Sequence, residues 1–98
     1  MSAIVNRQLQ GITPGASQAV AVGATSTPSS AVADNTQAVL LTSTVPCFVS
    51  VGSSPTAAAN SSLYLAANVP TVVAVSGGWK VAAIQASSSG TLYLTECA

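Results

Sequence analysis

The chain has 98 residues, a net charge of zero and only four charged side chains, which are Arg7, Asp34, Lys80 and Glu96. It has no histidine, and its 4% charged residues compare with about 25% in an ordinary soluble domain. This composition excludes most enzymes, nucleic-acid binders that contact phosphates, and histidine-based metal sites. Its 49% hydrophobic residues also exclude a disordered chain of low hydrophobicity and high net charge.

The first third of the chain, residues 1–35, is expected to be an extended N-terminal arm with short strands. Glycine and proline interrupt it repeatedly, at Gly11, Pro14, Gly15, Gly23 and Pro28. Its best strand candidate is residues 19–22, where Val20 and Val22 face the same side.

Residues 36–98 are expected to form a β domain. Short segments rich in valine, leucine and threonine alternate with turn signals every 8–12 residues or so, a spacing typical of an all-β sandwich or barrel. The expected strands are 36–44, 47–51, 62–66, 71–75, 79–86 and 91–95. No segment keeps a helical apolar period, so no long helix is expected. The predicted fold class is all-β, a small antiparallel β-sandwich preceded by the arm.

Alternation along these strands predicts which side chains point into the core. The leucines at 63, 65, 92 and 94 are expected to point inward, and Cys47, Val49 and Val51 are expected to share one side of their strand, opposite Phe48 and Ser50.

The aromatic side chains are the main anchor candidates, because each one buries a large area. Phe48 is expected in the core, and Trp79 fits either the core or an interface. Tyr64 and Tyr93 alternate with leucines and therefore face away from them, where they cover a second sheet or meet a partner.

The few ionisable side chains indicate no catalytic group. Asp34 lies in a turn-like stretch, where its carboxylate would bond to nearby backbone amides. Glu96 is expected to be a surface charge, or a partner of Arg7 or Lys80 across an interface. A serine–lysine pair would have to use Lys80, which we expect to be structural. We therefore expect no enzymatic activity and no cofactor.

The chain has two cysteines, Cys47 and Cys97, and they are expected to be reduced thiols, with a disulfide as the alternative. Two cysteines without histidine fall short of a zinc site, so no metal is expected.

Composition also limits the partners. Two positive side chains cannot line a phosphate-binding groove, so no nucleic acid is expected. The apolar runs are far shorter than a membrane span, and residues 1–7 lack the pattern of a secretory signal. A chain without net charge suits a place in a larger assembly. The candidate interface residues are Arg7, Tyr64, Trp79, Lys80 and Tyr93.

From Pro46 onward, about half of the chain carries a familiar pattern of strand and turn residues. The segments are CFVSVG at 47–52, SPTA at 54–57, SLYLAA at 62–67, VP at 69–70, GGWKVAAI at 77–84 and SGTLYLTE at 89–96. This pattern resembles small proteins in the structural modules of tailed bacteriophages, of the head decoration (cement) type.

The resemblance implies a virion component with a β-sandwich of jelly-roll type, made in the host cytoplasm. Such a protein would bind the outer capsid surface and bridge major capsid proteins, as a trimer or a dimer at a symmetry axis. Residues 1–35 would lie on a neighbour. The alternatives are a tail, collar or head-fibre subunit, or a module that binds glycan or ice.

Overall fold

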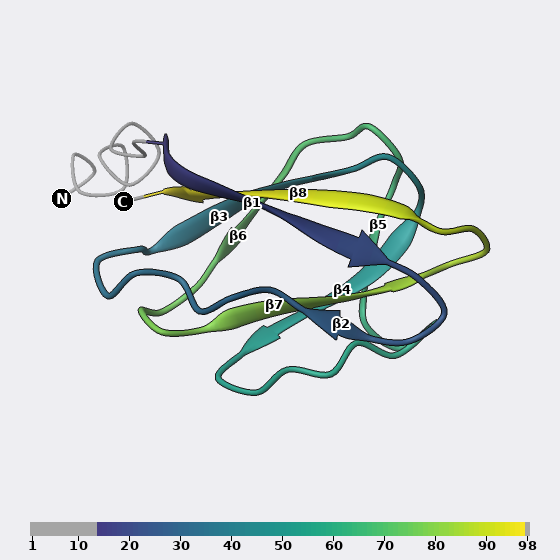
Figure 1. Ribbon diagram of the computed structural model, residues 1–98, viewed down its shortest axis with the longest axis horizontal. Helices are drawn as coiled ribbons and strands as arrows, with labels where there is room; N and C mark the ends of the chain where they lie inside the picture. Colours follow the sequence, from purple (N-terminus) through teal and green to yellow (C-terminus); the bar gives the residue numbers. More distant parts are fainter. Residues whose placement is uncertain (1–13, 98) are drawn as a thin grey trace, which may run out of the picture.

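The computed structural model describes residues 14–97, which form eight strands and no helix (Figure 1). The strands are β1 (Pro14–Val22), β2 (Thr27–Pro28), β3 (Ala38–Ser43), β4 (Cys47–Gly52), β5 (Leu63–Leu65), β6 (Thr71–Ala74), β7 (Lys80–Gln85) and β8 (Gly90–Cys97). The all-β prediction is confirmed, and each strand expected after residue 36 is present. Within the described part of the chain, no helix has the length and apolar character to cross a membrane.

The strands form two antiparallel sheets with the orders β1-β8-β3-β6 and β2-β7-β4-β5. The pairing is nested: β1 pairs with β8, β2 with β7, β3 with β6 and β4 with β5. The chain thus pairs like one long hairpin that is folded at the β4–β5 connection. The additional pairs β3–β8 and β4–β7 join the pieces of this hairpin into the two sheets.

Both sheets contribute to one hydrophobic core. The first sheet supplies Val20, Val22, Val39, Leu41, Leu92 and Leu94, and the second supplies Cys47, Val49, Leu65, Val81 and Ala83. The inward orientation predicted for the leucines of β8 is confirmed. The side that Cys47, Val49 and Val51 were predicted to share is the inner face of β4, with Val51 packed on the margin of the core.

Two predictions of inward side chains are wrong. Leu63 is 51% exposed although it pairs with the buried Val49, whereas Leu65 on the same edge strand is buried. Phe48 is only partly buried and lies outside the core cluster. It alternates with Cys47 and Val49, whose side chains occupy the inner face of β4, so Phe48 faces outward.

The described part of the expected arm, residues 14–35, is built into the sheets. Strand β1 forms an edge of the first sheet, and Val32 lies in the core. The side chain of Gln18 also bonds to the backbone of Ser30: Gln18 Nε2 donates to the carbonyl at 3.3 Å, and the Ser30 amide donates to Gln18 Oε1 at 2.9 Å. The side-chain amide group of Gln18 therefore braces β1 against the segment that follows β2. Residues 1–13 lie outside the described residues.

Candidate interaction surface

The outer face of the first sheet is uncharged throughout. Its exposed and half-buried side chains, which we call the Tyr93 face, are Ser17, Ala19, Ala21, Leu40, Thr42, Val72, Ala74, Thr91, Tyr93 and Thr95, whereas Ala38 and Cys97 of the same register are buried. Tyr93 stands at the centre of this face, between Ala19 and Thr42, and is 53% exposed. Val72 is 54% exposed at one margin. The face offers hydroxyls, methyl groups and one aromatic ring.

The outer face of the second sheet carries a row of larger side chains. The register aligns Tyr64, Phe48 and Ile84 across β5, β4 and β7. The Tyr64 and Phe48 rings meet with their centroids 5.4 Å apart and a tilt of 59°. Such edge-inclined pairs are a preferred aromatic geometry. Tyr64 remains 55% exposed, so this row presents an aromatic edge to the surroundings.

The predicted interface residues are not brought together. Tyr93 and Tyr64 lie on the outer faces of different sheets. Trp79 and Lys80 are both partly buried where β7 begins, and Trp79 packs against the core. Arg7 lies outside the described residues. Sequence reasoning missed Val72, although the pattern of residues 71–75 predicts that its side chain alternates with those of its neighbours.

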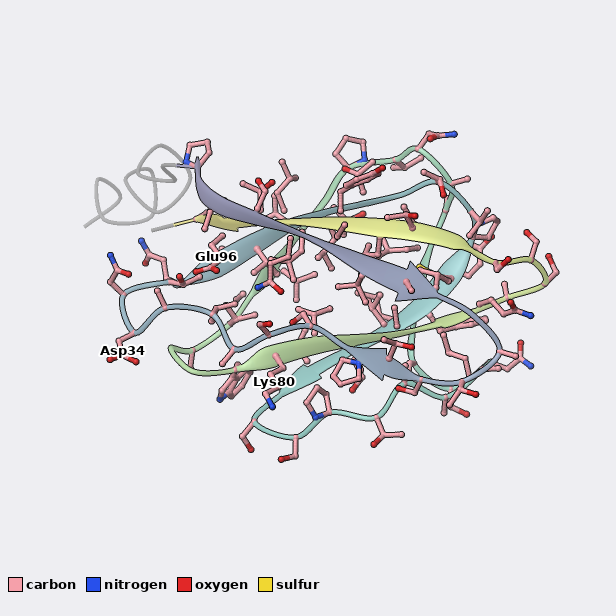
Figure 2. All side chains as sticks on the ribbon, viewed as in Figure 1. Asp34, Lys80 and Glu96 are labelled. Atoms are coloured by element: carbon pink, nitrogen blue, oxygen red, sulfur yellow. The ribbon has the colours of Figure 1, made fainter. Side chains whose placement is uncertain are left out.

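The three charged side chains of the described part lie in one half of the molecule, the half that contains the end of β8 (Figure 2). Asp34 is exposed in the turn between β2 and β3. Glu96 has a local role that the sequence did not predict: its Oε1 accepts hydrogen bonds from the Ala33 amide at 2.9 Å and from Thr36 Oγ1 at 2.8 Å. Its carboxylate therefore holds the β2–β3 loop in place.

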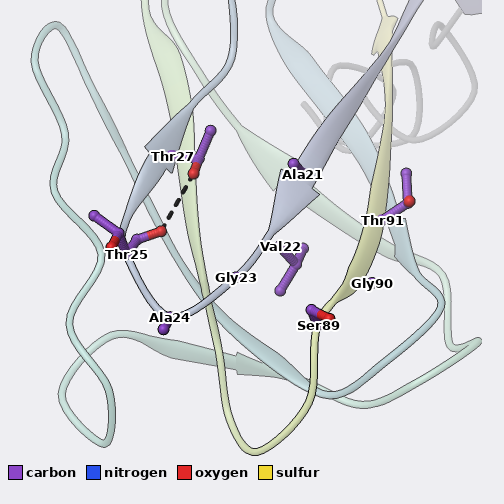
Figure 3. A pocket seen from close by; sticks show the side chains of 9 residues that line it. All are labelled: Ala21, Val22, Gly23, Ala24, Thr25, Thr27, Ser89, Gly90 and Thr91. Atoms are coloured by element: carbon purple, nitrogen blue, oxygen red, sulfur yellow. Dashed lines mark hydrogen bonds between the residues drawn. The ribbon is translucent and has the colours of Figure 1, made fainter.

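An open depression lies at the end of the sheets, between the β1–β2 turn and the start of β8 (Figure 3). It has a volume of about 520 Å³ and is lined by Ala21, Val22, Gly23, Ala24, Thr25, Thr27, Ser89, Gly90 and Thr91. The Thr27 hydroxyl donates to the Thr25 carbonyl at its wall. The lining offers hydroxyl and backbone groups, without a titratable or aromatic side chain, so it can form neutral hydrogen bonds only.

Cys47 and Cys97 are both free and buried. Burial raises the pKa of the Cys47 thiol, and a hydrogen bond with the Ser43 side chain lowers it in part. The thiol is therefore held neutral, which makes it a poor nucleophile. Residues 14–97 contain no group of three or more side chains that could hold a metal ion.

Comparisons of this chain with models of protein families, with curated proteins and with solved structures found no match.

Proposed function

We propose that this chain is a structural protein of a bacteriophage particle. It is a head decoration protein that binds the outer surface of the capsid and bridges neighbouring major capsid proteins. The observation that carries this proposal is the Tyr93 face, a broad uncharged surface on a rigid sheet. A surface of this kind can adhere through shape and apolar contact, which need no acid, base or metal.

We also infer that the two sheets form a sandwich of jelly-roll type. The nested pairing supports this inference, since it is the pairing expected of one long hairpin rolled into two layers. Jelly rolls have eight strands and are found in viral capsid and lectin domains. The core shared by the sheets supports the same inference, because a sandwich buries the inner faces of both.

The charge distribution suits attachment to a shell. Charged residues are depleted at the centre of protein interfaces, where aromatic residues are enriched. Tyr93 is an aromatic residue, and its neighbours across the strands, Ala19 and Thr42, are uncharged, so this face has both properties of an interface centre. Each contact of this kind is weak alone, but a protein that touches several subunits, or is itself oligomeric, gains avidity.

A lectin-like role has less support. Sugar sites usually combine an aromatic ring with polar side chains that fix orientation. The depression beside β1 and β8 has no aromatic lining, and the exposed tyrosines lie elsewhere.

The test is binding of the purified protein to capsid shells that lack it, measured by co-sedimentation. Tyr93→Ser and Tyr64→Ser remove equally exposed tyrosines from different sheets, so each variant is the control for the other. Attachment through the Tyr93 face predicts that Tyr93→Ser weakens binding about 30-fold, as for an interface anchor, whereas Tyr64→Ser leaves it nearly unchanged. Equal binding by both variants and the unmodified protein would contradict the proposal.

The arm hypothesis needs a truncation that spares β1. Removing residues 2–13 spares all eight described strands, whereas a longer deletion would remove β1 and its brace to Ser30. If these residues lie on a neighbour, their loss weakens attachment to shells without lowering the melting temperature. Unchanged attachment would refute this part of the proposal.

A further inference from the structure

Strand β6 ends one sheet and leaves part of its backbone facing outward. A hydrogen bond just beyond the end of β6 shows which of its residues direct their backbone groups toward β3. The Val75 amide donates to the Gln37 carbonyl at 3.1 Å. In an antiparallel pair, hydrogen-bonded and non-bonded residue pairs alternate. Continuing this alternation into β6, Val73 and Thr71 direct their backbone groups toward β3. Those of Val72 and Ala74 must therefore point away from it.

The hydrogen bonds between β3 and its other neighbour, β8, agree with this alternation of bonded and non-bonded residues. The Thr44 amide donates to the Thr91 carbonyl of β8 at 2.9 Å, in line with the β3–β8 register. Even-numbered residues of β3 therefore bond to β8. The odd-numbered residues Val39 and Leu41, which pair with Val73 and Thr71, are left to bond to β6.

The other three sheet edges differ from β6 in length, composition or side-chain bonds. Strand β1 is braced through Gln18 to Ser30, β2 has two residues and includes Pro28, and β5 has three residues. Proteins block strand addition with short edges, prolines and charges. The sequence of β6 is Thr-Val-Val-Ala, without charge or proline, and Val72 is exposed beside the free backbone groups.

We propose that β6 is an interface for a second copy of this chain, paired antiparallel about a two-fold axis that passes between the two copies of Val73. The outward backbone groups belong to Val72 and Ala74, which flank Val73 symmetrically. In this register, Val72 of each copy lies opposite Ala74 of the other. Each such pair exchanges two hydrogen bonds, so every outward donor and acceptor of both residues is used.

The side chains fit the same register. Val72 and Ala74 project to the outer face, so a larger side chain lies opposite a smaller one at both symmetric positions. Strand β6 carries no charged residue, so there is no repulsion between like charges where the two copies of β6 meet. The pairing joins two four-stranded sheets into one continuous sheet. This inference does not depend on the proposed role in a virion.

The experiment measures the mass of the full chain by sedimentation equilibrium, from about 1 μM to about 1 mM. The unmodified protein should form a dimer that dissociates on dilution. Val72→Lys should raise the dissociation constant at least about tenfold, because symmetry alters two positions at once. Val69→Lys is the matched control: Val69 is 50% exposed, Val72 is 54% exposed, and both variants add one positive charge, but Val69 precedes β6.

The double variant Val72→Lys/Ala74→Glu tests the register itself. It places lysine opposite glutamate of the second copy, so the dimer should be restored relative to Val72→Lys. Val72→Pro removes an outward amide while sparing the bonds to β3, and it should also weaken the dimer. Circular dichroism establishes that each variant is folded. A monomer throughout the concentration range would overturn the proposal. Equal effects of Val69→Lys and Val72→Lys, or failure of the double variant to restore the dimer, would do so too.

Discussion

Replacing Gly77 with alanine should destabilise the protein, because the added methyl group has no room. A Cβ at this position would lie 2.7 Å from Asp34 Cα and 2.8 Å from the Asp34 carbonyl carbon. Carbon atoms in contact prefer a separation of about 3.5–4.0 Å. The obstructing atoms are backbone, in a loop that Glu96 holds through Ala33 and Thr36. The β2–β3 loop therefore cannot move away without losing those hydrogen bonds.

The expected loss is about 2 kcal/mol, within the roughly 1–3 kcal/mol that an extra methyl group costs in a packed site. For a domain of this size, that loss lowers the melting temperature by roughly 10 °C. Gly23→Ala is the matched control, since no atom lies within 4 Å of the Cβ position there. That variant should leave the stability unchanged or raise it by up to about 1 kcal/mol, through reduced freedom of the unfolded chain.

The assay is urea unfolding of Gly77→Ala, Gly23→Ala, Glu96→Ala and the double variant Gly77→Ala/Glu96→Ala. Because removing the Glu96 carboxylate frees the loop, Gly77→Ala should destabilise the protein less in that background, by at least about 0.5 kcal/mol. Equal stabilities of Gly77→Ala and Gly23→Ala would refute the reasoning about the methyl group. Strict additivity in the double variant would show that Glu96 does not fix the loop.

The remaining predictions concern the Glu96 carboxylate, the core and one thiol. Glu96→Ala should lower the free energy of unfolding by about 1–3 kcal/mol, since two charge-assisted hydrogen bonds are lost, and an effect near zero in urea unfolding would contradict this role. Leu92→Ala should lower the free energy of unfolding by about 2–5 kcal/mol because Leu92 is fully buried, whereas Leu63→Ala at an exposed site should lower it by less than about 0.5 kcal/mol. Comparable losses would show that Leu63 is not exposed. Burial raises the pKa of the Cys47 thiol, so the folded state keeps its proton more tightly than the unfolded state, and this contribution to stability falls as pH rises above about 8.5. Between about pH 8 and pH 10, the free energy of unfolding should therefore fall more steeply for the unmodified protein than for Cys47→Ala. Parallel curves would exclude a raised pKa of the Cys47 thiol.

The local pattern of the sequence was enough to predict most strands. In β8, Leu92 and Leu94 point inward and Tyr93 outward, as strict alternation requires. Val20 and Val22 likewise face the core from β1. These predictions succeed because the side-chain period of a strand is a property of the local backbone.

The errors arise where distant segments decide the outcome. Alternation places Leu63 and Leu65 on the same face, yet only Leu65 is buried, so packing by other segments decides between the two leucines. Phe48 has the size of a core residue, yet the core is filled by its smaller neighbours on β4. The two hydrogen bonds that Glu96 accepts were not anticipated, because their donors, Ala33 and Thr36, lie some 60 positions earlier in the chain. None of these relations is encoded in a local window.

The candidate surface was predictable only in part. Tyr93 and Tyr64 were expected either to cover a second sheet or to meet a partner, and both are exposed in the structure, so neither covers a sheet of its own chain. Their separation onto different sheets, and the free edge at Val72, depend on which strands pair. Strand pairing over long distances is the information that a single sequence supplies least directly.

The central claim, that this protein decorates a phage capsid, is tested most directly by its copy number in purified virions. Quantitative mass spectrometry would measure the chain against the major capsid protein. The account predicts a ratio of roughly one to one, or a simple fraction of it, because a decoration protein repeats with the symmetry of the shell. A few copies per particle, or none, would contradict it.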